Sequence, residues 1–203
     1  MFLSLDGLDG SGKSTQLVRL AERLRAVGRT VTTCADPGGT DLGAKVREIL
    51  LFGRQTQMSL RAEALLFMAS RAELVERVIA PALARGEIVL SDRYLLANVV
   101  YQGHAGGLDP AELWQLGEFS TAGIEPDLTL ILDVPVSVAR SRQQPTRDRM
   151  ESRDDAYFQR VRDGFLKEAQ RRPERVRVID ATADADAVQE AIWGVVSQGV
   201  ALG

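Results

Sequence analysis

Two kinds of segment alternate along the chain, and this alternation limits it to a small set of folds. Five short runs are rich in apolar and β-branched residues, at positions 2–5, 30–34, 88–91, 128–133 and 176–180. The longer segments between them carry apolar residues at spacings of three and four, which is the pattern of an amphipathic helix. Repeated alternation of this kind predicts an α/β fold, a parallel sheet with helices on both faces.

Composition indicates the class of protein. The 203 residues are 45% hydrophobic and contain neither a repeat nor a linker, so we expect a single domain over residues 1–203. The net charge of −3 argues against nucleic acid as a partner. No apolar run approaches the roughly 20 residues of a membrane span. The single cysteine, Cys34, excludes an intrachain disulfide, and the chain begins with a strand-like run, so we expect a cytoplasmic protein.

Polar and glycine residues follow the predicted strands at the point where each one ends. The first run leads into residues 7–15, the second into 36–40, the third into Asp92 and Arg93, and the fourth ends at Asp133. In open α/β sheets, ligands bind at the carboxyl ends of the strands. We therefore expect the functional site at this edge.

The first of these loops matches the phosphate-binding pattern G-x-x-x-x-G-K-[ST] in full. The predicted ATP-binding residues are Gly7, Leu8, Asp9, Gly10, Ser11, Gly12, Lys13, Ser14 and Thr15. Backbone N–H groups of such a loop cradle phosphate oxygens, Lys13 places a charge on the β- and γ-phosphates, and the Ser14 hydroxyl is suited to ligate Mg²⁺. The alternative is an ordinary glycine-rich turn, but the loop lies between a strand and a helix, where a phosphate loop belongs.

A nucleotide-dependent switch is a second interpretation of the same loop. Residues 36–39 match the loose D-x-x-G pattern of such proteins. However, Asn98 is the only asparagine in the chain, so the guanine-reading motif N-K-x-D cannot occur. An enzyme that transfers a phosphoryl group is the favoured interpretation.

Six motifs in order give the chain a resemblance to the thymidylate kinase family. They are G-L-D-G at 7–10, D-P-G-G-T at 36–40, F-M-A-S-R at 67–71, D-R-Y at 92–94, Y-Q-G at 101–103 and R-D-R-M-E at 147–151. The resemblance implies phosphorylation of dTMP to dTDP with Mg-ATP, in dTTP biosynthesis, on the five-stranded, three-layer fold of nucleoside-monophosphate kinases. Another nucleoside-monophosphate or deoxynucleoside kinase remains the alternative.

The resemblance also implies roles at the acceptor side. Arg93 would grip the dTMP phosphate, and Asp9 would orient the sugar 3′-hydroxyl. Phe67 and Arg71, four residues apart and so on one helical face, would stack on thymine and donate to a base carbonyl. The remaining substrate candidates are Asp36, Arg47, Asn98, Tyr101 and Gln102. Among these, Asp36 replaces the usual Glu and is one methylene shorter.

Asn98 and Gln102 are also four residues apart and would face the pyrimidine edge. Tyr101 would fill the space of a ribose 2′-hydroxyl. Asp92 would act near the phosphate loop through water or Mg²⁺, which makes Ser14 and Asp92 the candidate metal ligands. His104 lies in the glycine-rich stretch 103–107, which predicts a solvated loop residue.

A polar, arginine-rich segment at about 141–152 resembles the mobile lid of this family. Its candidate catalytic residues are Arg142, Arg147 and Arg149, which would act together with Lys13 and Arg93. Gly10 offers no arginine from the phosphate loop, so the chain resembles the bacterial type, in which the lid supplies the arginines. The segment 65–79 carries more apolar residues than one sheet face can cover, and with the resemblance this predicts a homodimer.

Overall fold

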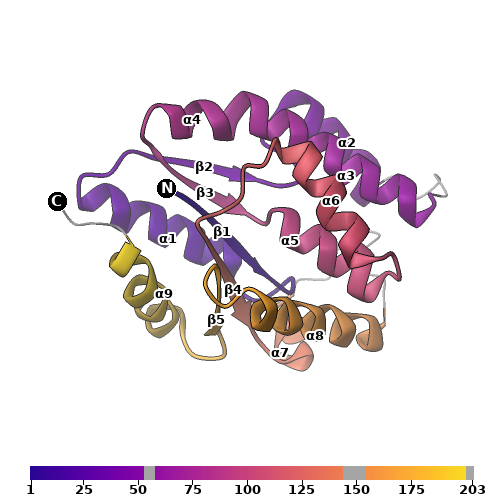
Figure 1. The fold of residues 1–203 in the computed structure, drawn as a ribbon. Helices are drawn as coiled ribbons and strands as arrows, with labels where there is room; N and C mark the ends of the chain where they lie inside the picture. The colour runs from indigo at the N-terminus through magenta and orange to yellow at the C-terminus, as the bar shows by residue number, and fades with distance from the viewer. Residues whose placement is uncertain (53–57, 144–153, 200–203) are drawn as a thin grey trace.

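The computed structural model describes residues 1–52, 58–143 and 154–199, and within them the predicted strands form one sheet (Figure 1). The strands are β1 (Phe2–Gly7), β2 (Val31–Ala35), β3 (Ile88–Asp92), β4 (Leu128–Asp133) and β5 (Val176–Asp180). They are all parallel in the order β2-β3-β1-β4-β5. The five-stranded parallel sheet is therefore confirmed, with β1 at its centre.

Helices cover both faces of this sheet (Figure 1). They are α1 (Lys13–Ala26), α2 (Asp41–Phe52), α3 (Leu60–Leu74), α4 (Ala80–Ala84), α5 (Leu95–Asn98), α6 (Pro110–Thr121), α7 (Val136–Arg142), α8 (Asp155–Arg171) and α9 (Ala185–Gly199). Two π-helical turns join neighbours, η1 (Val75–Ile79) between α3 and α4 and η2 (Val99–Ala105) after α5. No helix within the described ranges is both long enough and apolar enough to span a membrane.

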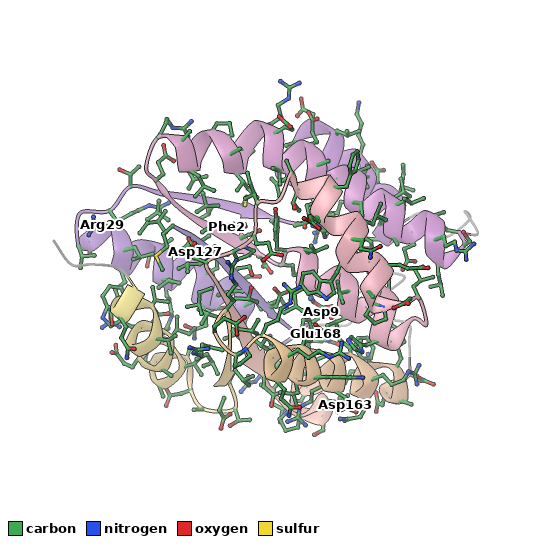
Figure 2. The ribbon with its side chains drawn as sticks, viewed as in Figure 1. Phe2, Asp9, Arg29, Asp127, Asp163 and Glu168 are labelled. Atoms are coloured by element: carbon green, nitrogen blue, oxygen red, sulfur yellow. The ribbon has the colours of Figure 1, made fainter. Side chains whose placement is uncertain are left out.

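The side chains of β1 pack alternately into two hydrophobic clusters. Leu3 and Leu5 lie in a cluster that also contains residues of α1, α8 and α9, whereas Phe2 packs with α3, α5 and α6. All of β1 is buried because β3 and β4 flank it and helices cover it. This burial explains the nearly continuous apolar run at the start of the chain. At the amino end of β1, the Phe2 N–H donates to Asp127 Oδ2 at 2.7 Å. Both residues are labelled in Figure 2.

The helical segment from α3 to α4 does not end at Pro81. Instead, the regular α-helix ends earlier, at Leu74, and continues through η1 into α4. Pro81 occupies the first turn of α4, where a missing backbone N–H costs little. The interruption therefore precedes the proline.

Candidate functional site

The phosphate loop leaves the carboxyl end of β1 and enters α1. Gly10 and Gly12 have φ angles of 85° and 95°, which favour glycine. A Cβ on Gly10 would lie 2.3 Å from the carbonyl oxygen of Ala139 in α7, and one on Gly7 would lie 2.5 Å from that of Leu132 in β4. The loop backbone is thus packed directly against neighbouring backbone, and no side chain fits at either position.

Lys13 is buried beneath this loop. Its Nζ donates to the carbonyls of Gly7, at 3.3 Å, and Leu8, at 2.9 Å. It also lies 3.6 Å from Asp9 Oδ1. Burial and the Arg93 charge lower the pKa of Lys13, while the nearby carboxylates oppose this shift. The ammonium is held by acceptors that belong to the loop itself.

Ser14 and Asp92 meet where β1 and β3 end. The Ser14 hydroxyl donates to Asp92 Oδ2 at 2.8 Å, across 78 residues of sequence. No group of three or more His, Cys, Asp or Glu side chains that could hold a metal occurs within residues 1–52, 58–143 and 154–199. Two hard oxygens nevertheless suit Mg²⁺, which keeps several waters and is completed by substrate phosphates. The donor set present here fits that ion.

Arg93 links the phosphate loop to the acceptor side. Its guanidinium donates to the Gly7 carbonyl at 3.0 Å, to Asp9 Oδ1 at 2.6 Å and to the Tyr101 hydroxyl at 3.2 Å. Its φ of 67° is unusual for a residue with a side chain, and such strain concentrates at functional sites. Burial would raise the pKa of Asp9, but the Arg93 and Lys13 charges outweigh it and hold that pKa well below its usual value.

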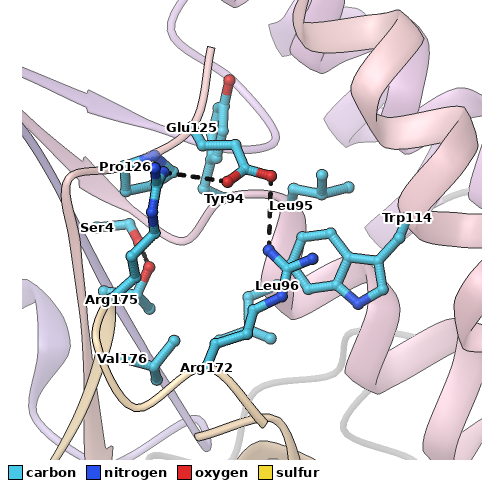
Figure 3. A pocket seen from close by; sticks show the side chains of 11 residues that line it. Ser4, Tyr94, Leu95, Leu96, Trp114, Glu125, Pro126, Arg172, Arg175 and Val176 are labelled. Carbon is cyan, nitrogen blue, oxygen red and sulfur yellow. Dashed lines mark hydrogen bonds and ion pairs between the residues drawn. The ribbon is translucent and has the colours of Figure 1, made fainter. Parts of the chain in front are cut away.

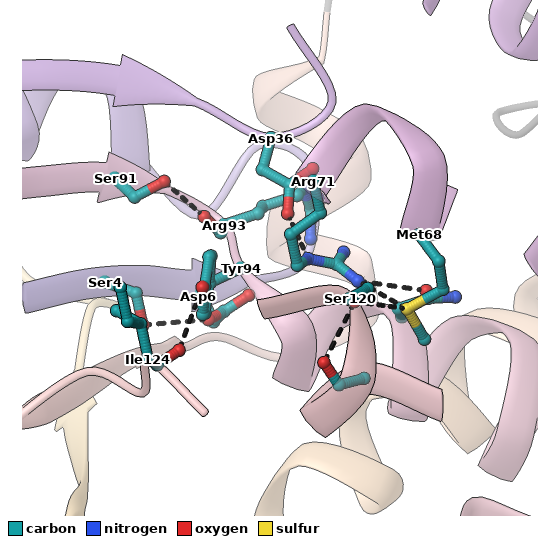
Figure 4. Close-up of polar contacts among 12 residues, drawn as sticks. Ser4, Asp6, Asp36, Met68, Arg71, Ser91, Arg93, Tyr94, Ser120 and Ile124 are labelled. Atoms are coloured by element: carbon teal, nitrogen blue, oxygen red, sulfur yellow. Dashed lines mark hydrogen bonds and ion pairs between the residues drawn. The ribbon is translucent and has the colours of Figure 1, made fainter. Parts of the chain in front are cut away.

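Asp36 and Arg71 form a buried ion pair, with Nε 2.5 Å from Oδ2 (Figure 4). The Arg71 guanidinium also donates to Asn98 Oδ1 at 3.3 Å and contacts the Met68 sulfur at 3.0 Å. Burial raises the pKa of Asp36, and the Arg71 charge opposes the shift. The Asp36 carboxylate therefore holds Arg71 in place.

The chain of polar contacts continues beyond Asn98. Asn98 Nδ2 donates to Gln102 Oε1 at 2.6 Å, and Gln102 Nε2 donates to Glu63 Oε1 at 3.0 Å. Sequence reasoning missed Glu63, which is 2% exposed in α3. A signal was present, since Glu63 precedes Phe67 by four residues and Arg71 by eight, which places all three near one helical face.

The other predicted site residues lie around this centre. Tyr101 is buried, and its backbone carbonyl accepts from the Tyr157 hydroxyl of α8 at 3.1 Å. Phe67 is half-buried in α3. Arg47 is exposed in α2 and donates to the Pro37 carbonyl at 2.9 Å.

The predicted lid lies mostly outside the described residues, including Arg147 and Arg149. Arg142, at its base, donates to the carbonyls of Ala181, at 2.9 Å, and Thr182, at 3.1 Å, in the loop after β5. Sequence reasoning also missed Gln143, whose Nε2 donates to the Asp9 carbonyl at 2.8 Å. The start of the predicted lid thus contacts both the phosphate loop and the loop after β5.

His104 is not a solvated loop residue, and that expectation was wrong. It lies in η2 with its side chain 11% exposed, and its Nε2 is 2.7 Å from Oε1 of Glu168. Glu168 is labelled on α8 in Figure 2. The neighbouring glycines allow close packing, because a Cβ on Gly103 would contact Leu113 at 3.1 Å and one on Gly106 the Gln102 carbonyl at 2.6 Å. Glycines required by packing resemble loop glycines in sequence.

A separate pocket lies toward the amino ends of β4 and β5 (Figure 3). The Arg172 guanidinium covers the Trp114 ring at 3.7 Å. Glu125 accepts from Arg172 at 3.5 Å and from Arg175 at 3.2 Å. Because both guanidinium groups are paired with this carboxylate, the pocket is a poorer anion site than the phosphate loop.

Comparison with known proteins gives a consistent result. The family model described as "Thymidylate kinase" matches residues 5–192. A thymidylate kinase of Rhodopirellula baltica is 49% identical over 193 residues, which cover 95% of this chain and 78% of that protein. One from Deinococcus radiodurans is 44% identical, with 98% and 97% covered. The crystal structure of thymidylate kinase from Ehrlichia chaffeensis superposes with a TM-score of 0.80 at 32% identity, covering 97% of this chain and 98% of that one.

Proposed function

The chain belongs to the thymidylate kinase family and phosphorylates dTMP to dTDP, and from this premise we propose how its residues divide the work. The observation that carries the proposal is the position of Arg93. Its guanidinium contacts the phosphate loop through Gly7 and Asp9 and the acceptor side through Tyr101. These contacts support a role for Arg93 at the point where the two substrates of a phosphoryl transfer meet.

Charge neutralisation is the main chemical demand of this reaction. The acceptor is a phosphate monoester with a second pKa near 6, so it is largely a dianion at neutral pH. A strong general base is unnecessary, and catalysis rests on positioning and on positive charge. In our proposal Lys13 serves the β- and γ-phosphates of ATP, and Arg93 holds the dTMP phosphate. Asp9, which orients Arg93, also accepts from the sugar 3′-hydroxyl.

Mg²⁺ is the proposed cofactor, held by the Ser14 hydroxyl and the Asp92 carboxylate. Their 2.8 Å hydrogen bond brings two oxygen ligands together beside the phosphate loop. When bound there, the ion would supply positive charge that neutralises part of the charge on the phosphates. The backbone of residues 7–15 supplies N–H donors to the same phosphates.

The thymine base is proposed to lie against Phe67, with its polar edge toward Arg71 and Asn98. Arg71 offers a donor and Asn98 Oδ1 an acceptor, which matches the O4 and N3–H of thymine. Tyr101 would lie beneath the sugar and favour deoxyribose. The remaining predicted substrate residues act less directly: Asp36 holds Arg71, Gln102 holds Asn98, and Arg47 holds the loop at Pro37.

The lid is proposed to complete the charge on the transferring phosphoryl group through Arg142, Arg147 and Arg149, the bacterial arrangement. The Ala139 carbonyl, 2.3 Å from a Cβ on Gly10, supports this division because it leaves no room for an arginine at residue 10. In the described state Arg142 binds the carbonyls of Ala181 and Thr182. Arg142 would therefore act from the base of the lid, where it also joins the lid to the loop after β5.

A homodimer is the proposed assembly, although the apolar residues of segment 65–79 are not all available for an interface. Met68, Leu74 and Val75 are already buried within one chain. The support comes instead from exposed apolar side chains on two neighbouring helices, Leu65 of α3 at 54% and Phe119 of α6 at 87%. We also propose a single domain and, given one free cysteine, a cytoplasmic location.

A panel of acceptors tests the proposed site. ADP release would be measured with ATP and, in turn, dTMP, dUMP, dCMP, UMP, AMP and thymidine. We expect ADP release with dTMP to be much faster than with dCMP or thymidine. dCMP lacks the matching base edge, and thymidine lacks the phosphate that Arg93 holds. Equal turnover of dTMP and thymidine would remove Arg93 from its proposed role.

A further inference from the structure

Five buried polar side chains form one continuous chain of hydrogen bonds beneath the proposed base site. In order they are Asp36, Arg71, Asn98, Gln102 and Glu63, and each is at most 3% exposed. Three elements supply the last four members, since Arg71 and Glu63 lie on α3, Asn98 ends α5 and Gln102 lies in η2. The chain therefore couples the orientation of each amide to its neighbours.

The charged groups determine which way the two amides point. A carboxylate accepts hydrogen bonds, so Gln102 turns its NH₂ group to Glu63, at 3.0 Å. Its carbonyl oxygen then faces Asn98 and accepts from Nδ2 at 2.6 Å. The Asn98 oxygen is left facing Arg71, whose guanidinium can only donate. Reversing either amide would place donor against donor or acceptor against acceptor.

We propose that Glu63 is a positioning residue that sets the orientation of the Asn98 amide and so makes the site select thymine over cytosine. This inference rests on the proposed placement of the base at Arg71 and Asn98. Thymine presents an acceptor at O4 and a donor at N3, whereas cytosine presents the opposite pair. With its oxygen held toward Arg71, Asn98 offers an acceptor beside a donor, the arrangement that thymine requires. Glu63 itself does not touch the base.

One nuclear magnetic resonance signal reports this orientation directly. Asn98 is the only asparagine in the chain, so protein labelled with ¹⁵N-asparagine gives a single side-chain NH₂ pair. In the wild-type protein we expect two distinct protons, one of them shifted downfield by its bond to Gln102. In Glu63→Gln, where residue 63 can also donate, the pair should shift or double. An unchanged pair in the variant, or freely averaging protons in the wild type, would overturn the inference.

Specificity provides the second readout. The ratio of kcat/KM for dTMP to that for dCMP should fall about tenfold in Glu63→Gln, mainly through the KM for dTMP, because one matched hydrogen bond is lost. Glu168→Gln is the matched control, since Glu168 is another buried glutamate but binds His104 and Trp114. Its ratio should equal that of the wild type. A ratio within twofold of wild type in Glu63→Gln, or an equal fall in Glu168→Gln, would refute the role of Glu63.

A second variant keeps the test decisive if Glu63→Gln does not fold. Gln102→Met breaks the link between Glu63 and Asn98 and should change both the NH₂ pair and the ratio in the same direction. Retention of both in this variant would overturn the inference. Equal wild-type turnover of dTMP and dCMP would instead overturn the base placement, while the NH₂ pair would still report whether Glu63 orients Asn98.

Discussion

Burial and neighbouring charges shift the pKa values of individual side chains at this site. Asp6, in β1 directly below the phosphate loop, shows the effect most clearly. Burial raises its pKa from 3.8 to about 7, even though the Arg93 and Lys13 charges oppose the shift. Within the described part of the chain, its Oδ1 has no hydrogen-bond partner. The carboxyl group is therefore held in a place that suits its neutral form.

Asp6 should make the stability of the free protein depend on pH. Between pH 4 and 7 the unfolded chain releases this proton while the folded chain keeps it, so stability falls as pH rises and then stays level. Asp6→Asn remains neutral in both states. The free energy of unfolding is measured in urea for both proteins. The value for Asp6→Asn minus the value for the wild type should increase by up to about 4 kcal/mol between pH 4 and pH 8. The exposed Asp163→Asn is the control, and a gain independent of pH would contradict the argument.

Lys13 should be indispensable for turnover but not for folding. Removing the ammonium in Lys13→Ala takes away charge stabilisation of the transferring phosphoryl group, so we expect kcat to fall by on the order of 10³ or more. Thermal unfolding by circular dichroism checks that the variant is folded. Lys45→Ala, on the exposed surface of α2, should retain full activity. More than a tenth of wild-type kcat in Lys13→Ala would be incompatible with the proposed role.

Helices and loops position these residues through close backbone contacts. The phosphate loop touches α7 at Gly10, and η2 packs against α8 through the His104–Glu168 bond and the Tyr157 hydroxyl. Both α7 and α8 border the segment predicted as the lid. The elements on either side of that segment are thus tied to the phosphate loop and to the helix that carries Gln102.

Gly10 and Gly28 offer a matched pair for testing the loop–helix contact. Both have positive φ, but a Cβ on Gly28 would meet open space, whereas one on Gly10 would meet the Ala139 carbonyl. Gly28→Ala should cost about 1–2 kcal/mol of stability from backbone strain alone. Gly10→Ala should cost a further 1–3 kcal/mol from overpacking and should also raise the KM for ATP. Urea unfolding measures the loss of stability, and initial rates measure the KM for ATP. An equal loss of stability in the two variants would show that α7 moves away from residue 10 without cost.

The folded chain exposes large apolar side chains, which would remain in contact with water if the protein were a monomer. Phe119 and Leu65 lie on α6 and α3, and Leu42 and Ile49, seven residues apart, share a face of α2. Helix α3 contacts both α2 and α6, so these residues belong to adjoining elements. An interface there would adjoin the helix that carries Phe67, Arg71 and Glu63.

Light scattering tests the proposed dimer. The wild-type protein at micromolar concentration should show twice the chain mass of 22.2 kDa. Phe119→Glu should shift the mass toward one chain, because a buried unpaired carboxylate destabilises an apolar interface. Val27→Glu, an equally polar change at the end of α1, should leave the dimer intact. A wild-type mass of one chain would disprove the assembly.

Local pattern was sufficient for the strands and the phosphate loop. The predicted strand positions agree with the observed ones within two residues, because period and turn chemistry are properties of neighbouring residues. The order of the strands in the sheet and the pairing of buried polar side chains could not be predicted from local pattern. Glu63 and Gln102 are 39 residues apart, and His104 and Glu168 are 64 apart. Only folding brings such groups together, and buried polar groups then require hydrogen-bond partners. The hydrogen bonds that link Glu63 through Gln102 to Asn98, and the buried position of His104, therefore depend on packing and not on sequence spacing.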